Sequence, residues 1–136
     1  MGLAEICDGL AVRFATISGL RAHAEPPSVV NPPAIIIGDP MSGEYDMAMG
    51  NGGVAHRMTA ILLVTKAGGT VRALEAVKAY IAASGASSIR AALQGDLTLG
   101  GAADTCRLVG YHDIGVIEYA GSEFMGCMFD VAVWES

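Results

Sequence analysis

The sequence predicts an α/β protein of one domain, in which an N-terminal helix and two mid-chain helices pack on a mixed or mainly antiparallel β-sheet. Two patterns and the chain length indicate this. Apolar residues recur at helical spacing in three segments, and short apolar runs between glycine and proline turns fill most of the rest. The 136 residues can bury one core but are too few for two. We therefore expect residues 1–136 to form a single domain.

The first expected element is an amphipathic helix. Apolar residues recur at helical spacing from Leu3 to Ile17, and Ser18-Gly19 then offers a glycine for the C-terminal position of the helix. A short strand is expected over 20–24, because the prolines of 25–27 offer no hydrogen-bond donor to a β-ladder. The chain thus begins with a helix and a short strand.

Three further strands are expected in the first half of the chain, at residues 34–37, 43–49 and 54–66. Gly38-Asp39-Pro40 should close the first of them. The glycine-rich segment 50–53 should join the other two into a hairpin. The third strand is almost wholly apolar from Ala60 onward, so we expect its end to lie at the centre of the sheet.

Two helices should follow the hairpin. Thr70 can cap the first, whose apolar stripe ends at Ile81. Ser87 or Ser88 can cap the second, over Ile89–Gln94. The remaining strands are expected at 104–111, 116–119 and 123–134.

The last of these strands is apolar on both faces. One face carries Met125, Cys127, Phe129, Val131 and Val133, and the other carries Phe124, Met128, Ala132 and Trp134. A small domain has one core to fill, so one face should cover that core. We expect the other face to meet a second polypeptide.

Composition favours assembly over membrane insertion. The chain is 52% hydrophobic with a mean hydropathy of +0.46, which is high for a monomer of this size. Its longest apolar runs, 34–37 and 60–64, are far shorter than the roughly 18 residues that a membrane helix needs. The excess apolar surface therefore indicates oligomerisation, with a well-filled core as the alternative.

Charge and cysteine content disfavour further classes. The net charge is −6 and the basic residues are scattered, which argues against tight binding to nucleic acid. Three cysteines without C-x-x-C spacing argue against a disulfide framework and a structural zinc site. The N-terminus lacks the pattern of a secretory signal, so we expect synthesis in a cytoplasm-like compartment.

No set of residues indicates catalysis. His23, His56 and His112 lie in separate segments without a partner at helical spacing, and no serine has the surroundings of a nucleophile. The closest approach to a phosphate loop is 66–70, which lacks the P-loop pattern. We expect no enzyme activity, cofactor or metal. A module that binds phosphate or nucleotide through Gly68-Gly69-Thr70 is the alternative of a different class.

Several motifs together resemble one family. They are Asn-Pro-Pro-Ala-Ile-Ile-Ile-Gly-Asp-Pro at 31–40, Tyr45-Asp46, Gly85-Ala86-Ser87-Ser88-Ile89 with Thr98-Leu99-Gly100-Gly101, Gly115-Val116-Ile117 and Phe124-Met125-Gly126. In their order and spacing they resemble the tail terminator proteins of long, non-contractile-tailed phages that infect actinobacteria. Each motif alone is a turn beside a short apolar strand, so the resemblance depends on their order, which spans nearly the whole chain.

The resemblance implies a structural virion protein. It would form a homohexameric ring at the head-proximal end of the tail, stop polymerisation of the tail tube and provide the surface on which the neck of the head docks. Its partners would be copies of itself, the major tail tube protein and the head-tail connector proteins. Genomic DNA would pass through the lumen without sequence-specific binding. Another head-tail connector or head-completion ring protein is the closest alternative.

The expected interfaces follow from the residues and from the ring together. Methionines cluster around the first hairpin, and their flexible side chains suit a surface that packs on a partner, with core filling as the alternative. A closed ring requires two different adhesive surfaces on each subunit. We expect these surfaces on the first hairpin and the last strand, at Met47, Met49, Met58, Phe124, Met128 and Trp134.

Overall fold

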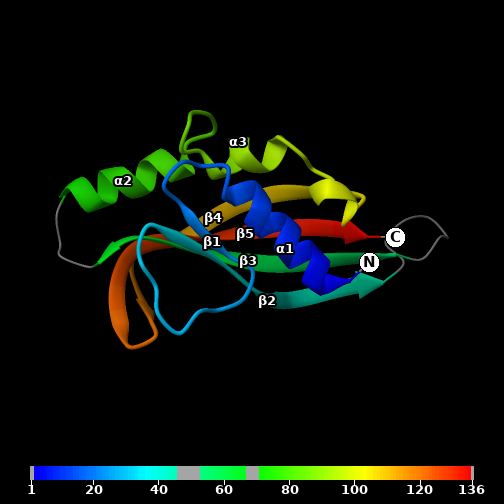
Figure 1. Ribbon diagram of the computed structural model, residues 1–136, viewed down its shortest axis with the longest axis horizontal. Helices are drawn as coiled ribbons and strands as arrows, with labels where there is room; N and C mark the ends of the chain where they lie inside the picture. The colour runs from blue at the N-terminus through cyan, green and yellow to red at the C-terminus, as the bar shows by residue number, and fades with distance from the viewer. Residues whose placement is uncertain (1, 46–52, 67–70, 136) are drawn as a thin grey trace.

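Three strands follow the first helix, and two further helices then precede the last two strands. The computed structural model describes residues 2–45, 53–66 and 71–135. Its elements are α1 (Leu3–Phe14), β1 (Arg21–His23), β2 (Ala34–Tyr45), β3 (Val54–Lys66), α2 (Val71–Ile81), α3 (Ile89–Gln94), a 3₁₀ turn (Leu99–Gly101), β4 (Thr105–Tyr119) and β5 (Ser122–Glu135). The predicted class is confirmed: α1, α2 and α3 pack on one mixed sheet (Figure 1).

The order of the strands determines which parts of the sheet are open. In the described residues the sheet has five strands in the order β1-β2-β3-β5-β4. β1 runs parallel to β2, and every other neighbouring pair is antiparallel. β1 pairs only with Ala34–Ile36, so the rest of β2 forms an edge. β4 forms the opposite edge along its whole length.

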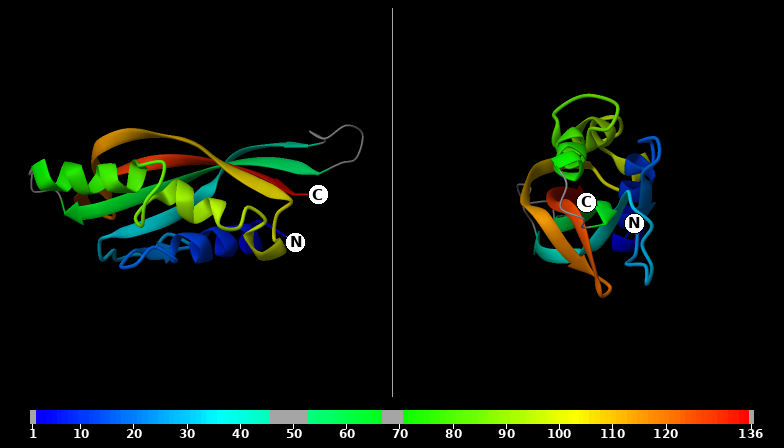
Figure 2. Two further views of the ribbon diagram at one scale, coloured as in Figure 1. Left: turned by 90° about the horizontal axis from the view of Figure 1, so that it is seen from above. Right: turned by 90° about the vertical axis from the view of Figure 1, so that its left-hand side faces the viewer.

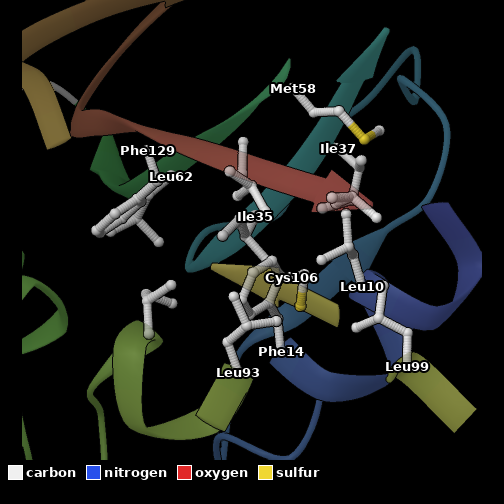
Figure 3. Packing of buried hydrophobic residues seen from close by; sticks show 14 of the residues in the cluster. Leu10, Phe14, Ile35, Ile37, Met58, Leu62, Leu93, Leu99, Cys106 and Phe129 are labelled. Atoms are coloured by element: carbon white, nitrogen blue, oxygen red, sulfur yellow. The ribbon is translucent and has the colours of Figure 1, made fainter. Parts of the chain in front are cut away.

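The main core lies between the sheet and the helices. Ile6, Leu10 and Phe14 of α1 are fully buried, because their spacing places them on one face of the helix. They share a cluster with residues of α3, β2, β3 and β5, including Leu93, Ile35, Leu62 and Phe129 (Figure 3). Burial of each large side chain contributes roughly 1.5–3 kcal/mol, so this cluster dominates the stability of the fold.

A second, smaller cluster lies on the opposite face of the sheet. It consists of Val30, Ala34, Ile36, Leu63, Ile117 and Phe124. The tip of the β4–β5 hairpin curls toward the segment before β2, and the Tyr119 hydroxyl donates to the carbonyl oxygen of Pro27 at 2.7 Å (Figure 1). The chain therefore covers part of the second face of β5 itself, where the sequence predicts a second polypeptide.

The strand break predicted at 38–40 is wrong. β2 runs without interruption from Ala34 to Tyr45, where the sequence predicts an end at Ile37 and a new strand from 43. The register with β3 shifts on both sides of Pro40, so these turn-forming residues make bulges inside one strand. Glycine is required at position 38, because a Cβ atom there would lie 2.9 Å from the Thr59 carbonyl oxygen.

The predicted separation of strands 104–111 and 116–119 is also wrong. Thr105–Tyr119 is one strand, and its register with β5 shifts between His112 and Gly115. Asp113 adopts a φ of 55°, in the left-handed region that aspartate tolerates better than most residues. The residues that suggested a loop therefore form a bulge that bends a continuous edge strand.

The helix ends agree more closely with the sequence. Ser88, rather than Ser87, caps α3: its Oγ accepts the backbone N–H of Ala91 at 3.1 Å. α2 ends at Ile81, the last residue of the predicted apolar stripe and three residues before Ser84-Gly85, where the sequence predicts its end, whereas the predicted cap Thr70 lies outside the described residues. α1 ends at Phe14 instead of Ile17, although Ile17 still packs in the main core.

Candidate functional site

Exposed apolar side chains gather on the two edges of the sheet. Among the large hydrophobic residues that the structure describes as exposed, β4 carries Val109, Tyr111, Ile114 and Val116, and the unpaired part of β2 carries Met41 and Tyr45. Edge strands usually carry lysine, proline or another feature that prevents pairing with a second chain. The combination of open backbone and apolar side chains makes these edges the candidate functional surfaces.

A groove lies between α3 and the first half of β4, and we call it the α3 groove. It has a volume of about 320 Å³, and its walls include Leu93, Leu97, Cys106 and Leu108. Arg90 and Arg107 also line the groove, and both residues are exposed. The groove therefore offers apolar walls beside the positive charge of Arg90, whereas the Arg107 side chain lies on the other face of the sheet.

Cys106 takes part in this groove as an apolar wall. Burial raises the pKa of its thiol to about 11, and the negative charge of Asp96 adds to the increase. The thiol stays protonated at neutral pH, so it lacks the thiolate that a nucleophile or metal ligand needs. Burial likewise raises the pKa of Cys127 to about 12.

Side-chain hydrogen bonds hold α3 and the turn after it in place. Arg13 of α1 donates from Nε and Nη2 to the carbonyl oxygen of Ala92, at 3.0 and 2.8 Å. The Asp96 carboxylate accepts the backbone N–H groups of Thr98 and Gly100 and the Thr98 hydroxyl. These bonds, with the Thr98 hydroxyl as the largest contributor, lower the pKa of Asp96. The wall of the α3 groove is therefore built before any ligand arrives.

An ionic cluster stands at the bulge of β4. The His112 Nδ1 lies 3.0 Å from Oδ2 of Asp113, and its Nε2 lies 3.1 Å from Oδ1 of Asp130 on β5. Ionised carboxylates only accept hydrogen bonds, so both contacts are hydrogen bonds only when both ring nitrogens carry protons. The bond to Asp113 chiefly raises the pKa of His112, and Asp130 adds to the increase although burial opposes it. The cluster thus favours the charged imidazole beside the exposed edge.

Two arginines lie on the face of the sheet away from the helices. Arg57 on β3 and Arg107 on β4 stand in one row across the sheet, with Ala132 of β5 between them. In the described part of the chain neither side chain has a hydrogen-bond or ion-pair partner. Arg107 lies on the edge strand β4, whereas Arg57 lies on β3, which has a neighbouring strand on each side.

The residues predicted as interfaces fall into different environments. Met58 is 1% exposed in the main core and Phe124 is 3% exposed in the second cluster, so both fill the interior of their own chain, contrary to the expectation of an interface. Met128 and Trp134 are half-buried on β5. Met47 and Met49 lie outside the described residues, as do Gly68-Gly69-Thr70.

The three histidines that the sequence analysis considered stay apart. His56 contacts Oε1 of Glu135 at 3.0 Å through Nε2, His112 lies at the bulge of β4, and His23 lies on β1. Within the residues described here, no three histidine, cysteine or acidic side chains are arranged to hold a metal ion. None of the helices in this part of the chain has the length and apolarity to cross a membrane.

Sequence reasoning missed the residues that form the candidate surfaces. Val109, Tyr111 and Val116 read as ordinary strand residues, and Arg90 and Arg107 read as scattered charge. The available signal was the absence of lysine and proline from residues 105–119, since both residue types commonly protect an edge strand. That signal has meaning only when the strand is known to lie at an edge.

Comparison with known proteins adds no relative to this picture. No family model matches the chain, and no curated protein is significantly similar to it.

Proposed function

We propose that this protein is a structural subunit of a phage virion, a tail terminator that forms a hexameric ring at the head-proximal end of the tail. There it stops polymerisation of the tail tube and provides the docking surface for the neck. Its partners are other copies of the chain, the tail tube protein and a head-tail connector protein. DNA passes through the ring without being read, in keeping with the net charge of −6.

One observation supports self-association most strongly: the two exposed edges differ in sequence and lie on opposite sides of the sheet. A two-fold dimer uses one patch that contacts its own copy. Contacts between two different patches join subunits head to tail and make a ring when the rotation closes. Two unlike adhesive edges are the property that a ring subunit needs.

The ordered motifs support the position of the ring in the virion. The motifs at 31–40, 85–89 with 98–101, 115–117 and 124–126 resemble those of tail terminator proteins, and the composition contains no set of catalytic residues. A connector or head-completion ring would use the same kind of edges. The two proposals differ in the neighbours that the ring contacts, so the test must locate the protein within the particle.

Electron cryo-microscopy of the neck of intact particles tests this proposal. We expect a six-fold ring of this chain between the last ring of the tail tube and the connector. Particles lacking the protein should contain tubes of uncontrolled length and free heads. Density for the chain on the head side of the connector would support the alternative ring. Absence of the protein from purified particles would overturn both proposals.

A further inference from the structure

We propose that neighbouring copies join by pairing the end of β2, residues 42–45, with the start of β4 in the next copy. In this contact Tyr45 enters the partner's α3 groove, and Glu44 lies against Arg107. The inference rests on the proposed ring and names the surfaces that close it. Both surfaces lie in the described residues, and each has the chemistry that the other lacks.

The registers place the two surfaces at the same height in the sheet. Ser42 pairs with Arg57, Arg57 with Ala132, and Ala132 with Arg107. In the next row Glu44 pairs with Ala55, Ala55 with Trp134, and Trp134 with Thr105. Neighbouring strands of a sheet are rotated by roughly 20–25° from each other, so the rotation that joins two copies must also match the tilt of the two edge strands. In the proposed contact it brings 42–44 of one copy beside 105–107 of its neighbour.

The strand directions make this contact antiparallel. β2 is antiparallel to β3, β3 to β5, and β5 to β4, so β2 and β4 run in opposite directions within one chain. The same rotation keeps that opposition between neighbouring copies. Antiparallel edges can exchange backbone hydrogen bonds directly, and only the residues after Pro40 and its bulges are regular enough to do so.

The faces of the sheet also agree. Ser42 and Glu44 share a face with Arg107, because their rows connect through alternate residues of the intervening strands. Tyr45 has the opposite orientation and therefore shares the face of Cys106 and Leu108, which line the α3 groove. One docking movement thus directs the aromatic ring toward apolar walls and the carboxylate toward the guanidinium group.

Each group in this contact is unsatisfied in the single chain. Tyr45 is 80% exposed. Glu44 and Arg107 have no ion-pair or hydrogen-bond partner among the described residues. Glu44 of one copy stands diagonally from Arg107 of the next, a separation of about 7–8 Å between backbone positions that long side chains can span. Charge, height, direction and face therefore all favour the same occupant, a second copy of this chain.

Charge exchange in the full-length protein tests the contact. We expect Glu44→Arg and Arg107→Glu each to raise the dissociation constant of the assembly about tenfold or more, because each brings like charges together. The double variant should restore the constant to within about threefold of the starting protein. Native mass spectrometry over a concentration series measures this constant. Arg57→Glu is the matched control, since it reverses an unpaired arginine in the same row away from the edge.

A second variant tests the groove without altering charge. Tyr45→Ser should weaken assembly while leaving the midpoint of thermal unfolding of the monomer unchanged, since the tyrosine side chain is exposed in the single chain. An assembly unaffected by all three single substitutions, or a chain that stays monomeric at high concentration, would overturn the inference. The proposed function is judged separately, by the presence of the protein in the neck. A charge-dependent assembly that is absent from particles would retain the contact and reject the function.

Discussion

The two edges of the sheet differ in how they are protected against pairing. β4 is open over Thr105–Tyr119 and has neither lysine nor proline, and only its two register shifts with β5 interrupt it. The opposite edge is covered by β1 at its beginning and interrupted by Pro40 and two register shifts, which leaves a short regular stretch at its end. This difference teaches that one edge can accept a strand on either side of its bulges, while the other can offer only a few residues at its end. Short regular stretches on both edges favour one defined contact over open-ended aggregation.

The largest expected effect concerns the helix beneath the protected edge. Phe14→Ala should destabilise the protein by about 3–5 kcal/mol, because it removes a fully buried aromatic ring from the main core. Denaturant unfolding at fixed protein concentration measures the loss. Val12→Ala, on the exposed side of the same helix, is the control and should change stability by less than about 0.5 kcal/mol. Equal losses in both variants would show that α1 does not pack as described.

A smaller effect is expected at the irregularity of the protected edge. Gly38→Ala should cost about 1–3 kcal/mol, since its Cβ would crowd the carbonyl oxygen of Thr59 at 2.9 Å and force β2 away from β3. Chemical denaturation gives the value. Gly2→Ala is a suitable comparison, because its Cβ would meet no atom within 4 Å. An unchanged stability of Gly38→Ala would contradict the close approach of the two strands.

The open edge can be given the protection that it lacks. Val109→Lys with Val116→Lys should change the free energy of unfolding by less than about 0.5 kcal/mol per site, because both side chains are already exposed. The same pair should abolish assembly, since lysine on an edge strand opposes pairing with another chain. Sedimentation velocity distinguishes the two effects. Val12→Lys, exposed on α1 and not part of an edge strand, is the control, and an intact assembly in the double variant would mean that β4 beyond Leu108 takes no part in the interface.

The smallest effect concerns the bulge of the open edge. His112 has a pKa raised above its ordinary value of 6.5 by Asp113 and then Asp130, so its charged form is favoured by folding. Its contribution to stability is fully present below the unfolded pKa and is lost as pH rises through the higher folded pKa. Unfolding followed from about pH 5.5 to 8.5 should show this decline, and His112→Gln should remove it. A decline of the same size in the variant would assign it to another group.

The sequence predicted local elements better than it predicted continuity. The extents of β3 and α3 and the cap at Ser88 or Ser87 follow from residues close together in the chain, and the structure confirms them. Gly38-Asp39-Pro40 and Asp113 suggested breaks because these residues favour turns. In the fold a neighbouring strand continues the ladder past each of them, so the turn preference produces a bulge instead of a loop.

The surfaces were less predictable for a related reason. In the sequence, Phe124 and Met58 cannot be distinguished from residues that face a partner. In the fold, however, Val30 and its neighbours cover Phe124, and α1 lies over the cluster that contains Met58. Exposure depends on which strand lies at the edge. The identity of the edge strand in turn depends on the insertion of β5 between β3 and β4, which no local sequence pattern predicts.

The position of β5 also governs the order of events during synthesis. β5 comes after every other strand in the sequence, but β4 meets the rest of the sheet only through it (Figure 2). Until residues 122–135 have left the ribosome, β4 has no neighbour to pair with and the wall of the α3 groove formed by Cys106 and Leu108 is not in place. Nascent chains on one messenger RNA therefore lack the acceptor surface of the proposed contact, so we expect that crowding on a polysome does not start assembly before each subunit has folded.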